Sequence, residues 1–169
     1  MKRVLFAVTF TVLLASCWST RSAVAQQTIT KEQLLGTWSL SSVVNVMSDG
    51  TKLQPYGGKE TGLLMLDAAG HFSLQIIQRD MPRFASNNRT KGTAAEYEAL
   101  ALGSLAYFGS YKLDDTGKAM SLHIENSSFG NFAGTDQKRT VALVGDELKL
   151  SNAAGASGGT STQTWKRAK

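Results

Sequence analysis

The most regular feature of the chain is an alternation of apolar and polar residues in short segments that are separated by turns. A period of two is typical of a β-strand that buries one face and exposes the other. Turn sequences such as Asp49-Gly50 and Gly145-Asp146 separate the segments and favour hairpins. The pattern predicts strands over residues 37–47, 62–66, 71–79, 106–113, 119–126, 137–144, 147–151 and 161–167.

Eight predicted strands with mostly short connections favour an all-β fold of the antiparallel up-and-down type. Closing such a meander into a barrel removes both exposed edges of the sheet. An eight-stranded barrel encloses a space that side chains fill or that holds about one small ligand. The sequence therefore predicts one domain, over residues 26–169, built as an eight-stranded antiparallel barrel with one inserted α-helix.

The phase of the alternation predicts which side chains line the barrel. In the first strand, one face carries Trp38, Leu40, Ser42, Val44 and Val46. In the strand over residues 71–79, we expect the apolar face to point inward, and it carries Phe72, Leu74 and Ile76. In the strand over residues 119–126, Met120, Leu122 and Ile124 alternate with the polar residues Ser121, His123 and Glu125.

Two segments depart from the strand pattern and predict helices. Thr30 and Gln33 form a capping box for one short helical turn, after which Leu34 and Leu35 would close one end of the barrel. Between the third and fourth strands, a polar loop over residues 80–89 leads to a predicted helix over residues 93–105. Thr93 is its N-cap and Glu96 completes the capping box. Its apolar face predicts a helix that lies against the barrel, with Tyr97, Leu100, Ala101, Ser104 and Leu105.

The first 25 residues predict export. Met1-Lys2-Arg3 is a positive n-region, residues 4–15 form a short apolar core, and Ala23-Val24-Ala25 is a signal peptidase site. The segment Leu14-Ala15-Ser16-Cys17 offers the alternative of a bacterial lipoprotein leader, residues 1–16, with the lipid on Cys17. Both alternatives place the protein in the periplasm or at the cell envelope. Cys17 is the only cysteine, so the folded domain has no disulfide bond.

The charge balance changes once the leader is removed. The chain carries a net charge of +5, but three basic residues and no acidic ones lie in the leader, which leaves about +2 for the domain. That small charge, with no basic stripe among aromatic residues, excludes a nucleic-acid binding surface. We expect contact with a membrane only through the possible lipid.

The segment Leu35-Gly36-Thr37-Trp38 opens the first strand, and Arg167 lies in the last. An indole can close one end of a barrel while a guanidinium stacks on its face and binds nearby carbonyl groups, so we expect structural roles for Gly36, Trp38 and Arg167. With the segments Gln54-Pro55-Tyr56-Gly57, Gly70-His71-Phe72-Ser73 and Gln163-Thr164-Trp165, the chain resembles a bacterial and fungal group of lipocalin-like domain proteins over about residues 34–167. The resemblance implies a lipocalin-like barrel and no particular activity.

The candidate site is the predicted barrel mouth. Three arginines there are able to hold an acidic head group, and three aromatic residues are able to form an apolar wall. The candidate ligand-binding residues are Tyr56, Arg79, Arg83, Phe84, Tyr107 and Arg139. The alternative is that Asp80, Asp136 and Glu60 pair with these arginines and that the aromatic residues belong to the core. The favoured function is binding of a small apolar or amphipathic molecule.

Two other function classes stay open. A barrel enzyme of the isomerase or cyclase type would use polar interior residues, for which the candidates are Gln75, Arg79, His123 and Gln163. A barrel packed shut would serve as a structural module of the envelope. The sequence has no Gly-x-Ser-x-Gly motif and no cysteine after the leader, which argues against nucleophilic catalysis, and it identifies no catalytic residue.

The two histidines are also candidate metal ligands. His123 and Glu125 share one face of a strand, and with His71 they would supply two imidazoles and a carboxylate. A solvated outer face is the simpler interpretation of these residues. The sequence therefore predicts neither a metal nor a cofactor.

Overall fold

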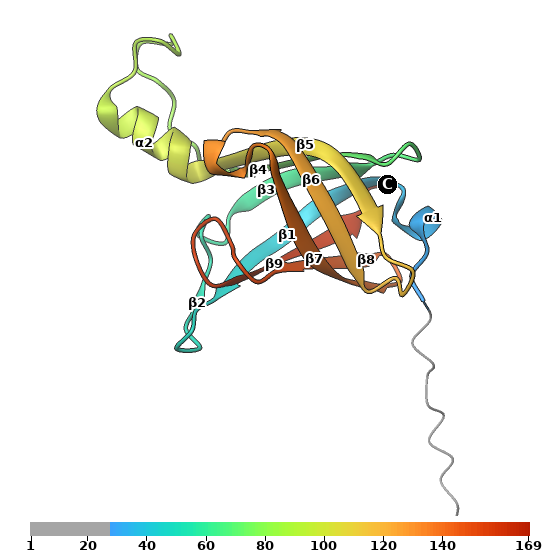
Figure 1. Ribbon diagram of the computed structural model, residues 1–169. Coiled ribbons are helices and arrows are strands. Elements are labelled where there is room, and N and C mark those ends of the chain that lie inside the picture. The colour runs from blue at the N-terminus through green and yellow to red at the C-terminus, as the bar shows by residue number, and fades with distance from the viewer. Residues whose placement is uncertain (1–27) are drawn as a thin grey trace, which may run out of the picture.

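The computed structural model describes residues 28–169. The predicted leader and Cys17 lie outside the described residues. Within this range, no helix has the length and apolar character needed to cross a membrane. Figure 1 shows a barrel of strands with one helix, α2, projecting from it.

The sheet is continuous and closes on itself. Its strand order is β2-β1-β3-β4-β5-β6-β7-β8-β9, and pairing of β1 with β9 completes the barrel. All paired strands are antiparallel. The strands are β1 Gly36–Val46, β2 Lys52–Leu53, β3 Glu60–Leu66, β4 His71–Gln78, β5 Ser104–Leu113, β6 Ala119–Ser127, β7 Thr135–Val144, β8 Glu147–Asn152 and β9 Thr160–Arg167.

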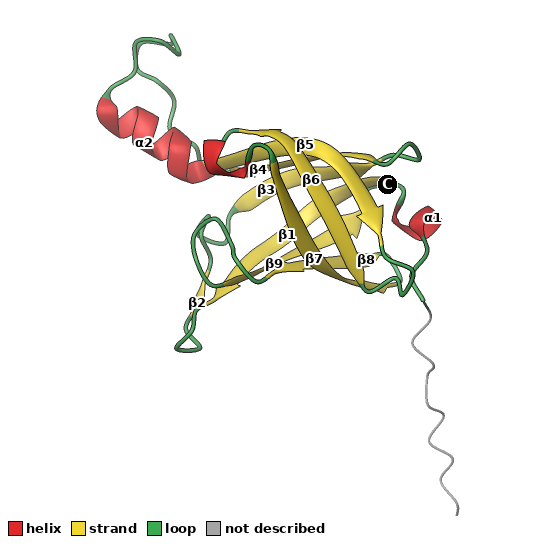
Figure 2. Cartoon of the chain, viewed as in Figure 1, coloured by secondary structure: helices red, strands yellow, loops and turns green. Residues whose placement is uncertain are grey.

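This architecture confirms the predicted antiparallel up-and-down barrel. Eight strands form the closed wall, and the two-residue strand β2, which pairs only with β1, is an addition that the sequence pattern did not predict. Figure 2 shows how little of the chain is helical. The helical segments are α1 Lys31–Leu34, α2 Ala94–Gly103 and the 3-10 turn η1 Gly130–Phe132.

The predicted inward faces of β4 and β6 are confirmed, since Phe72, Leu74 and Ile76 on β4 and their counterparts on β6 are buried in the core. The predicted face of β1 is wrong beyond Leu40. The register between β1 and β9 shifts between Leu40 and Ser42, which marks a β-bulge. An extra residue reverses the phase of the strand. Val43 and Asn45 therefore point inward, in place of Ser42, Val44 and Val46.

One end of the barrel is sealed by Trp38, Leu34 and Arg167, and we call it the closed end. Trp38 and Leu34 are fully buried, and the Trp38 Nε1 donates a hydrogen bond to the Leu34 carbonyl at 2.9 Å. Arg167 lies 4.1 Å from the centre of the indole and donates to the Leu35 and Gln33 carbonyls at 3.0 and 2.6 Å. Gly36 has a φ of +110°, a conformation that favours glycine over any residue with a side chain.

The connection between β4 and β5, residues 79–103, forms an arm that ends in α2. The predicted helix is confirmed with its cap, since Thr93 and Glu96 form both bonds of a capping box. The prediction that the helix lies against the barrel is wrong, because Figure 1 shows α2 pointing away from it. Tyr97 packs edge-to-face on Phe84 of the same arm, with 5.4 Å between ring centres. The helix thus buries part of its apolar face against its own loop.

Candidate ligand-binding site

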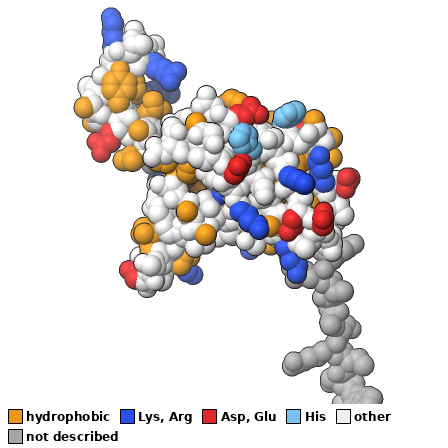
Figure 3. Space-filling model, in the orientation of Figure 1, with side chains coloured by type: hydrophobic (Ala, Val, Ile, Leu, Met, Phe, Trp, Pro, Cys, Tyr) orange, Lys and Arg blue, Asp and Glu red, His pale blue; other side chains and the backbone are white. Residues whose placement is uncertain are grey.

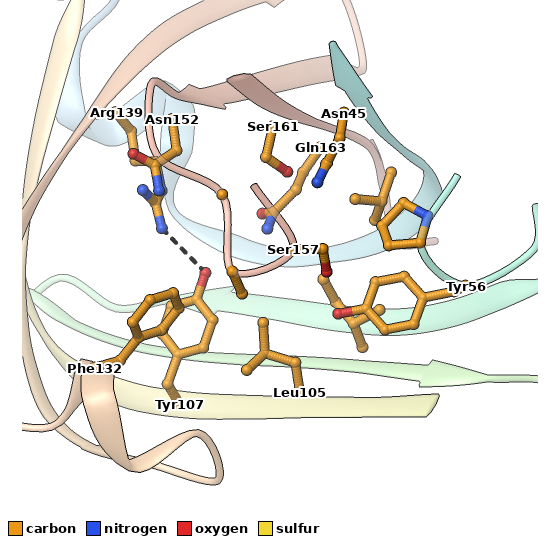
Figure 4. A pocket seen from close by; sticks show the side chains of 15 residues that line it. Asn45, Tyr56, Leu105, Tyr107, Phe132, Arg139, Asn152, Ser157, Ser161 and Gln163 are labelled. Carbon is orange, nitrogen blue, oxygen red and sulfur yellow. Dashed lines mark hydrogen bonds between the residues drawn. The ribbon is translucent and has the colours of Figure 1, made fainter. Parts of the chain in front are cut away.

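A cavity lies inside the barrel at the end opposite the closed end. Its volume is about 20 Å³, room for about one water molecule. The apolar part of its wall comes from Val43, Ile76, Leu105, Tyr107 and Phe132. Polar side chains from β1, β7 and β9 complete it, and Figure 4 shows them converging on the same space. We call this end of the barrel, opposite the closed end, the polar end. Its buried polar side chains are those of Asn45, Glu60, Arg139 and Gln163.

Arg139 is the main charge inside the polar end. It is 3% exposed, because it follows the inward phase of β7 two residues before the buried Val141. Its Nη2 donates to the Gln137 Oε1 at 2.6 Å and makes a long contact of 3.5 Å with the Tyr107 hydroxyl (Figure 4). Its Nη1 is buried without a partner among the described residues. None of the carboxylates in residues 28–169 forms an ion pair with this guanidinium.

Three acceptor atoms at the same end also lack partners. They are the Asn45 Oδ1, the Glu60 Oε2 and the Gln163 Oε1, and none has a hydrogen bond from any described residue. Glu60 opens β3, and its other oxygen accepts a bond from the Val43 backbone N–H at 2.7 Å, just past the β1 bulge. A buried polar atom without a partner costs about 1–3 kcal/mol, so such atoms are rare in folded proteins. One further unpaired group, the Trp165 Nε1, lies one inward position nearer the closed end on β9.

Tyr56 brings a second phenol to the cavity. It comes from the loop between β2 and β3 and is 7% exposed. Burial, together with the nearby Tyr107 and Glu60, raises the pKa of Tyr56 to about 12. The phenol is therefore neutral near pH 7 and is able to donate a hydrogen bond into the cavity.

The loop between β8 and β9, residues 153–159, covers the cavity from outside. Gly155, Ala156 and Ser157 line the cavity, and Figure 4 shows Ser157 opposite Tyr56. The Asn45 Nδ2 ties this loop to β1 by donating to the Gly158 carbonyl at 2.9 Å. Gly158 and Gly159 have positive φ values of 84° and 65°, so the path of the loop requires glycine at both positions.

The structure brings three of the six predicted ligand-binding residues to this cavity, namely Tyr56, Tyr107 and Arg139. The other three, Arg79, Arg83 and Phe84, belong to the arm and do not line it. The carboxylates considered as alternative partners for the arginines bind elsewhere. Asp80 pairs with Lys59 at 3.1 Å and Asp136 with His123 at 2.8 Å, while Glu60 accepts from Val43.

Several cavity residues were not predicted as ligand contacts. Asn45 has no role in the sequence-based prediction, because no sequence signal marks the bulge that turns it inward. The inward position of Ser161 and Gln163 can be inferred from the sequence, since both lie an even number of residues from the buried Trp165 on the same strand. Of the four residues proposed for a barrel enzyme, only Gln163 is interior, whereas Gln75, Arg79 and His123 are exposed.

Comparison with known proteins finds one matching family and several similar structures. The family model described as "Lipocalin-like domain" matches residues 35–168. The chain is similar to a lipocalin-like protein from Bacteroides uniformis, with 17% identity and a TM-score of 0.44 over 80% of this chain and 98% of that one. It is also similar to the wild-type fluorescent protein UnaG, with 11% identity and a TM-score of 0.39 over 82% and 100% of the two chains. Among curated proteins, none matches the chain. The match to the family model over most of the chain shows that this protein belongs to the lipocalin-like domain family.

Proposed function

We propose that this protein, exported by its N-terminal leader, binds a small amphipathic molecule at the polar end of the barrel, with an acidic group of the ligand on Arg139. The observation that carries the proposal is the buried Arg139 guanidinium, which lacks a carboxylate partner among residues 28–169 and leaves Nη1 unpaired. A carboxylate, sulfonate or phosphate would supply the missing acceptor through a charge-assisted hydrogen bond.

The remaining wall of the cavity supports the same class of ligand. Val43, Ile76 and Leu105 form an apolar part of the same cavity wall. The unpaired oxygens of Asn45 and Gln163, which line the cavity, are acceptors, so they favour a ligand that also carries hydroxyl or amine donors. A mostly apolar wall with a few convergent polar groups is typical of small-molecule sites.

The present volume of about 20 Å³ is too small for any such ligand, so binding requires the cavity to open. The segment placed to move is the loop over residues 153–159. It connects two strands without pairing into the sheet, and the Asn45 side chain is one of its attachments to β1. Displacing this loop would open the cavity to solvent without breaking the barrel wall.

The test uses two dyes that differ in charge. The anionic 8-anilinonaphthalene-1-sulfonate carries an acidic group, whereas N-phenyl-1-naphthylamine has a similar aromatic body and no charge. We expect Arg139→Gln to weaken binding of the anionic dye about tenfold or more, because a hydrogen bond to a charged group contributes about 1.5–3 kcal/mol. Binding of the neutral dye should change less than about twofold. Fluorescence titration measures both affinities.

The matched control is the double variant Arg79→Gln/Arg83→Gln, which removes the two arginines of the arm. It should leave both affinities unchanged. If instead the double variant weakens the anionic dye and Arg139→Gln does not, the site lies at the arm and the proposed cavity is wrong. Tyr107→Phe, which keeps the charge of Arg139, should have a smaller effect than Arg139→Gln, and it checks that the loss does not come from misfolding.

The small cavity favours one alternative, a barrel packed shut that serves as a structural module of the envelope. Native mass spectrometry of protein purified without detergent separates the two functions. A reproducible extra mass of small-molecule size that leaves on mild activation supports ligand binding. A clean mass of the chain alone, together with no saturable binding of either dye, would establish the packed barrel instead.

A further inference from the structure

Both histidines of the protein lie in one row across the outer face of the barrel. In the strand register, His71 on β4 is paired with Ser110 on β5, and Ser110 is paired with His123 on β6. The next strand, β7, continues the row with Asp136 opposite His123. At the other end of the row, Asp67 extends β3 beside His71. Five side chains thus lie in sequence over five neighbouring strands.

Each histidine is held by the carboxylate on its outer side. The Nδ1 of His71 is 3.0 Å from the Asp67 Oδ2, and the Nδ1 of His123 is 2.8 Å from the Asp136 Oδ1. Each carboxylate thus occupies Nδ1 and leaves Nε2 as the ring nitrogen that is able to bind a ligand. Ser110, which has a short side chain, lies between the two histidines in the row.

The distance across the row suits a shared ligand. Neighbouring strands are about 4.8 Å apart, so the backbones of His71 and His123 are separated by about 10 Å. Two imidazoles that reach toward the middle are able to span this distance around one ion, since zinc binds histidine nitrogen at about 2.0–2.1 Å. The two histidine side chains are 64% and 53% exposed, so an ion in solution reaches them freely. Figure 3 shows both histidines, in pale blue, on the same face of the barrel.

We propose that the Nε2 atoms of His71 and His123 bind one divalent transition-metal ion of the zinc type above Ser110. Imidazole nitrogen is a preferred ligand of such ions. Asp67 and Asp136 would fix the Nδ1–H tautomer, which leaves Nε2 free to bind and makes it a stronger donor, as carboxylates do behind histidine ligands in known zinc sites. The sequence offers His71, His123 and Glu125 as metal ligands only as an alternative to a solvated outer face, whereas the strand register places the two histidines in one row.

The ligand set predicts exchangeable binding. The described residues hold no group of three or more His, Cys, Asp or Glu side chains that could hold a metal. The site therefore has two protein ligands, and water completes the coordination, as at zinc sites with an open position. The row lies on the outer face of the barrel, so this proposal is independent of the ligand cavity inside.

The test is a zinc titration followed by NMR of the histidine rings. The protein has two histidines, so each ring signal is assignable from a single variant. We expect the His71 and His123 signals to shift together, with one midpoint and one zinc ion per chain. His71→Ala should move the midpoint for His123 at least tenfold higher, and His123→Ala should do the same for His71. The proposal is overturned by separate midpoints in the wild-type protein, by a midpoint unchanged in the single variants, or by no shift at millimolar zinc.

Two further variants separate metal binding from trivial effects. Asp136→Asn keeps both histidines but removes a carboxylate behind one of them, and it should weaken zinc binding about 10–100-fold. Asp115→Asn removes an exposed carboxylate from the turn between β5 and β6 and should leave the midpoint unchanged. The double variant His71→Ala/His123→Ala measures any zinc bound elsewhere on the protein. Equal effects of Asp136→Asn and Asp115→Asn would reduce the site to general charge attraction and overturn the proposed geometry.

Discussion

The two ends of the barrel each place an arginine against aromatic side chains, yet they leave it in different states. At the closed end, Arg167 stacks on Trp38 and donates hydrogen bonds to the carbonyl groups of Leu35 and Gln33. At the polar end, Arg139 is more deeply buried, and its Nη1 has no partner among the described residues. Both terminal nitrogens of Arg167 thus have acceptors, whereas only one of those of Arg139 does.

The difference indicates what each end is for. A buried polar group with partners stabilises the fold or is neutral, whereas one without a partner destabilises it by about 1–3 kcal/mol. Four unpaired polar atoms gather at the polar end, on Asn45, Glu60, Arg139 and Gln163. Residues that cost stability at one place in an otherwise consistent fold are typical of functional sites. The closed end therefore serves the fold, and the polar end supports the proposed binding.

The largest expected effect is at the closed end. Trp38→Ala should lower the free energy of unfolding by about 3–5 kcal/mol, because it removes a fully buried indole and leaves a cavity. It also leaves the Leu34 carbonyl without the donor that Nε1 supplies and removes the ring on which Arg167 stacks. Urea unfolding followed by far-UV circular dichroism measures the change. A loss below about 1 kcal/mol would show that the closed end is not what holds the barrel together.

The opposite sign is expected at the polar end. Arg139→Met should raise the free energy of unfolding by about 2 kcal/mol, because an apolar chain of similar length replaces a buried charge that lacks a carboxylate partner. The same variant should lose binding of the anionic dye. Parallel urea unfolding and dye titration check both statements. If Arg139→Met destabilises the protein as Trp38→Ala does, the two ends do not differ and Arg139 is a structural residue.

Most of the barrel is predictable from the sequence, because apolar and polar residues alternate with a period of two in each strand that buries one face. β4 and β6 alternate cleanly, so their inward faces are predicted correctly. In β1 the alternation is ambiguous, because Val43 and Val44 are adjacent and either could continue the apolar face. The bulge that selects Val43 is a property of the pairing between β1 and β9. The arm shows the same limit, since the apolar face of α2 gives no indication that Phe84, rather than the barrel, covers Tyr97.

The sequence predicts those residues of the candidate site that lie at inward positions of a regularly alternating strand. Arg139 lies two residues before Val141 on β7, so its inward position accompanies that of a buried valine. Arg79 comes directly after β4 ends at Gln78, so no strand fixes its side chain in the barrel. Asn45 depends on the bulge, and the cover over residues 153–159 depends on a Gly-rich loop whose path is set by contacts with β1. These parts need the three-dimensional structure.

A smaller effect should appear at the polar end at alkaline pH. Burial raises the pKa of Tyr56 from 10.0 to about 12, so the neutral phenol is favoured in the folded state. The stability that this contributes is present below pH 10 and is lost as pH rises from 10 through 12. At pH 11 the loss should be about 1.4 kcal/mol relative to pH 8. Tyr56→Phe should remove this part of the alkaline loss, and urea unfolding of both proteins at pH 8 and 11 measures it. Equal alkaline losses in the two proteins would mean that Tyr56 is not buried.

The smallest effect on stability is expected for Asn45→Ala. This change removes the bond from Nδ2 to the Gly158 carbonyl, but it also removes the unpaired Oδ1, so the two effects should cancel to within about 1 kcal/mol. The loop over residues 153–159 should nevertheless open more often, because one of its ties to β1 is gone. Amide hydrogen exchange should therefore increase in this loop and stay unchanged in the turn around Gly70, near the closed end. If exchange increases equally at both ends, Asn45 stabilises the whole barrel. An increase confined to the loop would show that the Asn45 side chain holds this loop over the cavity.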